Sequence, residues 1–441
     1  MDLKKTIKRI FMVIPLPKKT KEKLIEDHKT RIMKKEEDIT LGLNNHITLN
    51  SELNNNYSDY IKNILRIPAR QSNLYKEIET HSLSDHRKVT MVAYYLTQFH
   101  PADTNDMWWG KGTTEWTNVS KAVPQYVGHM QPRLPGELGY YDLRIIDNIR
   151  RQAELARNYG IDCFAFYYYW FNGKRVLEKP LNEFIQNQDI DIKYCLCWAN
   201  ENWSKRFNGT DDGSILVLDH NEAEYKEFIK DVSQSFDDKR YYMINNKYVL
   251  IIYCPSKIPN CENIVKYWRS YINTKLGREI YLIASLERGN TIDWTKYGFD
   301  AMSQFQPASI GDSIPDVTSN YKIMRSDFKG HIYCYSDILN SLEKTHPQLK
   351  KTYAAVMPSW DNTPRRNQRG IIYDGNTPEL FKKWLNSIIE WTEENESLDE
   401  KIVFLNAWNE WGEGAYMEPD RDFGYGNLQS VWEANCGKNY I

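Results

Sequence analysis

Two glutamates three residues apart, Glu410 and Glu413, have the spacing in this 441-residue chain that most directly suggests chemistry. In a turn or a first helical turn, such side chains project to the same side, with Cβ atoms roughly 5 to 6 Å apart. Two carboxyls this close cannot both ionise freely, so one pKa should rise while the other group stays a base. Retaining cleavage of a glycosidic bond needs such a pair. A solvated helix start, where glutamate favours the helix dipole, is the alternative.

The surrounding residues favour catalysis over that alternative. Trp408 and Trp411 flank the pair, and Gly412 and Gly414 permit close approach of other groups. The whole chain is rich in rings, with 14 Trp, 30 Tyr and 15 Phe making 13% of its residues. Such a content predicts either a large aromatic core or a groove whose rings stack on sugars or bases.

Aromatic, amide and carboxyl side chains follow most of the apolar runs that we interpret as strands. Rings stack on the apolar faces of pyranoses, and amides and carboxylates hydrogen-bond the hydroxyls, so we predict a sugar-binding rim. Rings that only fill the wide top of a barrel are the alternative. The candidate substrate-binding residues are Tyr95, Gln98, His100, Trp108, Trp109, Glu115, Trp116, Tyr169, Trp170, Asn172, Trp198, Asn200, Glu201, Trp203, Trp360, Asp361, Trp408, Asn409 and Trp411.

Three of these candidates have other possible roles. Glu201 could be an acid or the ion-pair partner of Lys205 or Arg206, although we favour substrate binding. A lone loop histidine such as His100 is more often a hydrogen-bonding residue than a catalyst. Asp361 could fix a sugar hydroxyl or pair with Arg365.

The elements that must position these residues begin at residue 88, where short apolar runs alternate with amphipathic stretches. Several runs are almost continuously apolar, which is typical of parallel strands buried on both faces. Eight of them predict a (β/α)₈ barrel with enlarged loops, whose active site lies at the carboxyl ends of the strands. The expected strands are residues 89–99, 161–170, 194–199, 248–253, 280–286, 301–305, 353–358 and 402–407.

Amphipathic stretches between these runs predict the helices, at 143–159, 181–187, 222–236, 261–274, 336–343 and 378–393. A doubly wound open sheet is the rival fold. Its usual cofactor signal, Gly-x-Gly-x-x-Gly after a strand, is missing. We therefore predict an α/β protein with a catalytic (β/α)₈ domain at 88–441 and a polar, partly ordered extension at 1–87.

Charge and cysteine placement exclude several classes of function. The net charge is −2, so nothing predicts nucleic-acid binding. Cysteines 163, 195, 197 and 254 lie in apolar runs, which predicts buried thiols and a reducing compartment. No spacing suggests a metal site, and we expect neither metal nor cofactor.

The first 35 residues hold twelve Lys or Arg against four Asp or Glu, a local excess of +8. The run Ile10–Leu16 contains Pro15 and has no small-residue cleavage site, so it does not resemble a signal peptide. We interpret this segment as a solvated tail, with weak contact to an anionic membrane surface as the alternative. The location we predict is cytoplasmic, or at the inner face of the membrane.

Several long motifs, in order, resemble the WbsX-like proteins, which are bacterial enzymes of cell-surface polysaccharide loci similar to glycoside hydrolase family 99. The resemblance spans roughly residues 88–435. The motifs are QFHP at 98–101, WWGKGTTEWTN at 108–118, YYYWFNGK at 167–174, CWANENW at 197–203 and WNEWGEG at 408–414.

The resemblance implies a retaining, metal-independent (β/α)₈ enzyme. In the hydrolase relatives, which cleave α-mannosidic linkages, the glutamate matching Glu410 deprotonates the substrate 2-hydroxyl, which attacks the anomeric carbon to give an anhydrosugar. The glutamate matching Glu413 protonates the leaving oxygen and then activates water or an acceptor. The implied substrate is a glycan or lipid-linked oligosaccharide of O-antigen or capsule metabolism.

Two other functions stay open. One is a sugar-nucleotide-dependent glycosyltransferase of lipopolysaccharide biosynthesis, since WbsX-like proteins are commonly described as glycosyltransferases. The Asp-x-Asp match at Asp189 and Asp191 falls before the third predicted strand, on the wrong rim for a metal-binding transferase motif. The other is a non-catalytic glycan-binding protein, against which the intact glutamate pair argues.

Overall fold

The computed structural model describes residues 58, 61–62, 71–81, 87–204, 214–289, 291–310 and 313–437. The chain divides into two compact units, residues 1–62 and 63–441. The basic segment 1–35 and its predicted membrane contact lie outside the described residues. Within the described residues, no helix is both long enough and apolar enough to cross a membrane.

Eight parallel strands close into a barrel, as the apolar runs predict. Strand β1 pairs with β2 on one side and with β15 on the other, with Val92 beside Cys163 and Thr90 beside Ile402. The strands are β1 (Thr90–Tyr95), β2 (Cys163–Phe171), β4 (Lys193–Trp198), β8 (Lys247–Ile252), β9 (Glu279–Ser285), β10 (Ala301–Ser303), β12 (Thr352–Val356) and β15 (Ile402–Leu405). All nine residues of β2 are buried, as expected of a strand that contacts the barrel interior and the outer helices.

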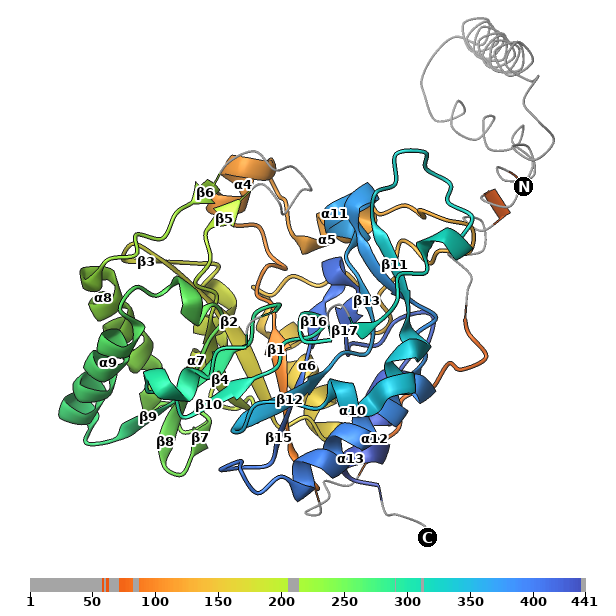
Figure 1. Ribbon diagram of the computed structural model, residues 1–441. Helices are drawn as coiled ribbons and strands as arrows, with labels where there is room; N and C mark the ends of the chain where they lie inside the picture. The colour runs from red at the N-terminus through yellow and green to blue at the C-terminus, as the bar shows by residue number, and fades with distance from the viewer. Residues whose placement is uncertain are drawn as a thin grey trace, which may run out of the picture. The chain divides into compact units, whose positions relative to one another are not determined.

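Helices surround this barrel, with α8 and α9 on one flank and α12 and α13 on another (Figure 1). The main outer helices are α6 (Ile146–Asn158), α7 (Lys179–Gln186), α8 (Glu222–Val232), α9 (Cys261–Leu276), α12 (Pro378–Glu394) and α13 (Gly426–Asn435). The helix expected at 336–343 is mostly a 3₁₀ helix, η8 (Tyr335–Ser341), followed by one turn of α-helix, α10 (Leu342–Thr345). Helix α13 was not predicted.

Short elements beyond the carboxyl ends of the strands build the rim. The loop after β1 carries α4 (Asp103–Trp109) and α5 (Glu115–Ser120). A small sheet joins β11 (His331–Cys334), β14 (Ile371–Asp374) and β13 (Trp360–Asp361), and α11 (Thr363–Arg366) lies in the chain between β13 and β14. The hairpin of β16 (Asn409–Glu410) and β17 (Ala415–Tyr416) encloses the 3₁₀ turn η10 (Trp411–Glu413).

Part of the expected N-terminal extension packs on the barrel unit. The backbone N–H of Lys76 donates to the carbonyl of Phe423 (3.0 Å), and the ring of His81 stacks on Trp432 with centroids 3.9 Å apart. Segment 71–81 therefore contacts the region around α13, while the boundary at residue 87 stays a prediction. The expected burial of Cys163, Cys195, Cys197 and Cys254 is confirmed.

Candidate active site

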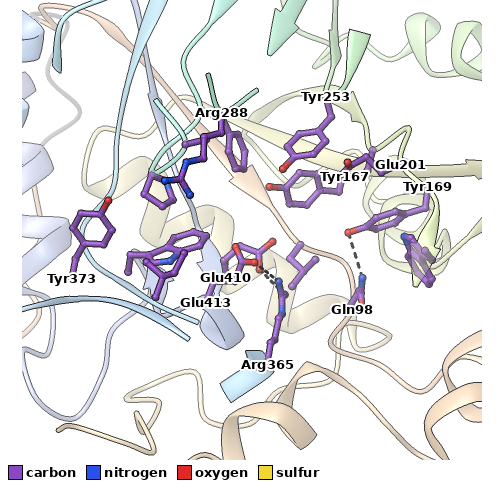
Figure 2. A pocket seen from close by; sticks show the side chains of 18 of the residues that line it. Gln98, Tyr167, Tyr169, Glu201, Tyr253, Arg288, Arg365, Tyr373, Glu410 and Glu413 are labelled. Carbon is purple, nitrogen blue, oxygen red and sulfur yellow. Dashed lines mark hydrogen bonds and ion pairs between the residues drawn. The ribbon is translucent and has the colours of Figure 1, made fainter. Parts of the chain in front are cut away.

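A cavity of about 440 Å³ opens above the carboxyl ends of the strands, and we call it the main cavity. Seven of the predicted site residues line it: Gln98, Tyr169, Glu201, Trp203, Trp360, Glu410 and Glu413. Figure 2 shows the two glutamates between Arg365 on one side and Tyr167 and Tyr253 on the other. The structure therefore brings both predicted catalytic residues to one cavity wall.

Arg365 is the residue that joins the acidic groups of this wall. Its Nε donates to Glu115 Oε1 (2.8 Å), one terminal nitrogen donates to Glu410 Oε2 (2.7 Å), and the other lies 2.8 Å from Glu413 Oε1. The Glu115 and Glu410 side chains are 0% and 5% exposed, and that of Glu413 is 23% exposed. One rigid guanidinium therefore fixes three carboxyls in a nearly dry environment, where charge-assisted bonds are strong.

Both catalytic candidates have raised pKa values. Burial raises the pKa of Glu410 to about 8; Arg365 opposes this rise, and the nearby Glu413 and Glu115 add to it. Burial also raises the pKa of Glu413, against the charge of Arg365. The sequence predicted that only one carboxyl would be raised, whereas the buried pair together retains a proton more firmly than either group would in water.

Gly412, in the turn between the two glutamates, leaves the space that this arrangement needs. A Cβ built on Gly412 would lie 1.5 Å from Glu115 Oε1 and 2.9 Å from Arg365 Nε. Gly414 closes the turn with φ +63°, a conformation that L side chains rarely adopt. The backbone of η10 therefore packs directly on the ion-paired cluster, and the two glycines have a steric function.

Several predicted site residues support the cluster from behind instead of lining the main cavity. Asp361 accepts hydrogen bonds from the backbone N–H (3.0 Å) and hydroxyl (2.6 Å) of Thr363, the first residue of the helix that carries Arg365. Its other oxygen lies 2.8 Å from His129 Nε2, so Asp361 pairs with His129 and not with Arg365. Although burial opposes it, His129 keeps the pKa of Asp361 well below its usual range. Asp361 thus anchors α11.

Asn409, Trp411 and Trp116 fix the hairpin in the same way. Asn409 exchanges two hydrogen bonds with the backbone of Leu96 at the end of β1, at 2.7 and 3.0 Å. The Trp411 ring stacks on Tyr416 and its Nε1 donates to the buried Glu418 (2.6 Å). Trp116 packs against Trp411 with centroids 5.5 Å apart. These residues position Glu410 and Glu413.

The structure places the other predicted residues away from the main cavity. Tyr95, Trp170 and Trp198 are buried against other parts of the fold, because successive side chains of a strand point to opposite faces, and Trp408, just before β16, is buried as well. For example, Tyr95 donates to Gln152 on α6 (2.6 Å), and Trp198 stacks on Phe228 of α8 with centroids 3.8 Å apart.

The remaining predicted site residues are polar loop residues and the two tryptophans of α4. His100 and Asn200 are buried and hydrogen-bond to backbone groups, and Asn172 is exposed and bonds to the loop at Val217. Trp108 lies on α4 with 41% exposure and lines neither the main cavity nor the space beside it. Trp109 lines that adjoining space.

Tyrosines, not tryptophans, supply most of the rings of the main cavity. Five line it, of which sequence reasoning named only Tyr169; the others are Tyr167, Tyr253, Tyr333 and Tyr373. The residues Arg365, Arg288 and Phe305 were also missed as site residues. The alternation in β2 could have indicated Tyr167, which lies two residues before Tyr169 and therefore on the same face. Across the described residues, no three His, Cys, Asp or Glu side chains gather closely enough to hold a metal ion.

Comparison with known proteins identifies the family of the chain. The profile described as glycosyltransferase WbsX matches residues 91–431. Protein WxcX of Xanthomonas campestris pv. campestris strain B100 is 37% identical over 357 residues, which cover 80% of this chain and 51% of WxcX. WxcX of strain ATCC 33913 matches to the same extent. The chain spans about half the length of these curated relatives.

One solved structure with low sequence identity shares the fold. A glycoside hydrolase-like protein superposes with a TM-score of 0.52 at 15% identity, covering 81% of this chain and 96% of the other. The GH99 endo-α-mannosidase from Bacteroides thetaiotaomicron gives a TM-score of 0.48 at 14% identity, covering 80% and 96%. The strand pairing forms a (β/α)₈ barrel, and the matching profile is that of a family described as glycosyltransferases. The chain belongs to the WbsX glycosyltransferase family.

Proposed function

We propose that this protein cleaves or transfers a glycosidic bond with retention of anomeric configuration, using Glu410 and Glu413. The observation that carries the proposal is the contact of one guanidinium with both carboxyls at the wall of a ring-lined cavity. Tyrosine rings offer stacking faces for pyranoses, and Gln98 and Glu201 offer groups that hydrogen-bond hydroxyls. A cluster that served only stability would not need to face a cavity.

Two steps account for retention. In the first, Glu410 takes the proton of the substrate 2-hydroxyl, whose oxygen attacks C1 while the C1–O bond to the leaving group breaks and Glu413 protonates the departing oxygen. In the second, Glu413 takes a proton from water or an acceptor hydroxyl, whose oxygen opens the anhydrosugar at C1 as Glu410 returns its proton to O2. Each step inverts C1, so two steps retain the configuration.

The pKa values give this mechanism a pH dependence. The first step needs one proton on the pair, with Glu410 ionised and Glu413 protonated. For a glycoside whose leaving group needs protonation, we expect a bell-shaped profile of kcat/KM whose alkaline limb lies above the usual range of a carboxyl, because burial raises the pKa of both glutamates. For a glycosyl fluoride, which needs no acid, the alkaline fall should disappear. Identical profiles for the two donors would contradict the assigned roles.

Glycosyl fluorides also test the assignment directly. The wild-type enzyme, Glu410→Gln and Glu413→Gln are incubated with a panel of α-glycosyl fluorides, with and without sodium azide. For Glu413→Gln we expect slow fluoride release that azide accelerates at least about tenfold, giving the α-glycosyl azide, since azide needs no general base. For Glu410→Gln we expect less than about a hundredth of wild-type release under either condition. Near-normal release by Glu410→Gln, or a β-configured product, would overturn the proposal.

We propose further that the substrate is a glycan or lipid-linked oligosaccharide of cell-surface polysaccharide metabolism. Because the family is described as glycosyltransferases, we propose transfer to an acceptor in addition to hydrolysis. The excess of +8 in the first 35 residues supports action in the cytoplasm, at the anionic inner face of the membrane. Product analysis with water alone and with added sugar acceptors separates hydrolysis from transfer.

A further inference from the structure

A second space, of about 310 Å³, adjoins the main cavity. Three arginines line it, and we call it the arginine hollow; its wall is formed by Gln98, Trp109, Asn202, Trp203, Asn362, Arg365, Arg366, Arg369, Ile371 and Glu413. The rings of Trp109 and Trp203 lie with their centroids 6.3 Å apart, tilted by 47°. The hollow thus combines cationic side chains with flat apolar rings. The function proposed for the main cavity does not explain this combination.

The position of the hollow relative to the two glutamates indicates which part of the substrate it binds. Glu413 lines both spaces, whereas Glu410 lines the main cavity alone. In the proposed mechanism, Glu410 acts on the sugar whose C1 reacts and Glu413 acts on the departing oxygen. The reacting sugar therefore occupies the main cavity, and the group on the other side of the cleaved bond extends into the arginine hollow.

The charges of the hollow favour an anion there. Arg365 is paired with Glu115, Glu410 and Glu413, so its charge is largely matched within the cluster. Arg366 adds positive charge on the hollow side, Arg369 also lies in its wall, and Glu413 is the only carboxyl among the described residues that line it. Burial raises the pKa of Glu413, and the charge of Arg366, together with that of Arg365, opposes the rise. Arg366 therefore acts electrostatically at the position where the leaving oxygen would lie.

From this arrangement we infer that the arginine hollow binds a phosphate or diphosphate group carried by the departing part of the substrate. Guanidinium groups bind phosphate oxygens in a bidentate manner. The tryptophan pair would cover the apolar or flat part next to the phosphate. The C1–O bond breaks, the oxygen takes the proton of Glu413, and the phosphate stays on the departing fragment. The placing of the departing fragment in the hollow rests on the proposed function. The binding of an anion there does not depend on that function.

Inorganic pyrophosphate is the probe that tests the anion site, with binding measured by isothermal titration calorimetry. We expect wild type to bind pyrophosphate, Arg366→Gln to bind at least about tenfold more weakly, and Arg366→Lys, which keeps the charge, to lie between them. Arg278→Gln is the matched control, since Arg278 directly precedes β9 at the opposite rim of the barrel, and its affinity should equal that of wild type. No binding to wild type, or equal binding by Arg366→Gln, would overturn the inference.

Further ligands and one further variant, tested in the same way, refine the result. Uridine diphosphate and geranyl diphosphate compete for the same site; tighter binding of either than of pyrophosphate supports the inference and identifies a nucleotide or a lipid as the source of the phosphate. Tight binding of galacturonate without any binding of pyrophosphate would overturn it in favour of an acidic sugar. Glu410→Gln should bind pyrophosphate at least as tightly as wild type does, because Glu410 does not line the hollow and its loss leaves the charge of Arg365 less matched. If that variant also keeps its turnover, the mechanism fails while the anion site stands.

Discussion

Replacing Arg365 by glutamine should abolish turnover and destabilise the fold more than any other single change at the site. The variant leaves Glu115, Glu410 and Glu413 without the cation that contacts all three. The pKa values of Glu410 and Glu413 should then rise further, so both carry protons at neutral pH and no base is left. We expect kcat/KM to fall by at least about 10³-fold, measured with a glycosyl fluoride that wild type accepts.

The stability of Arg365→Gln should depend on pH. Removing one partner of a buried ionic cluster costs about 3–5 kcal/mol when the other partners stay charged. Raised pKa values in the folded state mean that stability is largest at low pH and is lost as pH rises through those values. Denaturant unfolding should therefore show a small loss at pH 5.5 and a larger loss at pH 9. A pH-independent loss would contradict this account.

Lysine at the same position separates charge from geometry. Arg365→Lys keeps a cation but cannot present three donors in a fixed fork, so it should recover part of the stability and little of the turnover. Arg278→Gln, at the opposite rim, is the control for loss of an arginine and should match wild type in kcat/KM. If Arg365→Lys were fully active, a point charge would suffice and the bridging geometry would be unnecessary.

Gly412→Ala should cause the second large effect, through steric displacement. The new methyl group would lie 1.5 Å from Glu115 Oε1 and 2.7 Å from its carboxyl carbon, distances at which something must move. Glu115 is fully buried, so its displacement breaks the bond to Arg365 and shifts the groups that hold Glu410. We expect kcat/KM to fall by at least about 10²-fold, because small misplacement of catalytic groups has effects of this size.

A double-mutant cycle identifies the cause of that loss. Glu115→Ala removes the carboxyl that the methyl group would meet, so Gly412→Ala should cost much less activity in the Glu115→Ala background than in wild type. Gly277→Ala is the matched control: this glycine caps α9 with φ +62° at the opposite rim, so alanine there strains the backbone but should leave kcat/KM unchanged. Additive effects at Gly412 and Glu115 would exclude the steric explanation.

The barrel itself was predictable from the order of apolar runs. Each of the eight expected strands overlaps an observed one, because strands buried on both faces must be apolar along their whole length. The 3₁₀ helix η8 and the unpredicted α13 show where this signal weakens. Gly426–Asn435 has mixed polar residues, and it is helical because it packs against α12. Tertiary packing decided what propensity left open.

The candidate site was predictable only in part. Local spacing was enough to select Glu410 and Glu413 as candidates, because both lie in one turn. Ring type was a poor guide to the other site residues, since Trp198 ends β4 and Trp408 follows β15, but both rings pack between the barrel and the helices. Strand alternation decides whether a residue faces the barrel interior, and one step along the chain reverses it.

The sequence by itself determined the barrel order, the paired carboxyls and the family. The tertiary structure decided which groups meet. Arg365 bonds to Glu115 across 250 positions and to Glu410 across 45. No local pattern encodes such a contact, because it forms only when loops after different strands converge on the same rim of a closed barrel. Burial then raises the pKa of Glu410 to about 8, with Glu413 and Glu115 adding to the rise; spacing indicates the carboxyl pair, but burial makes the largest contribution.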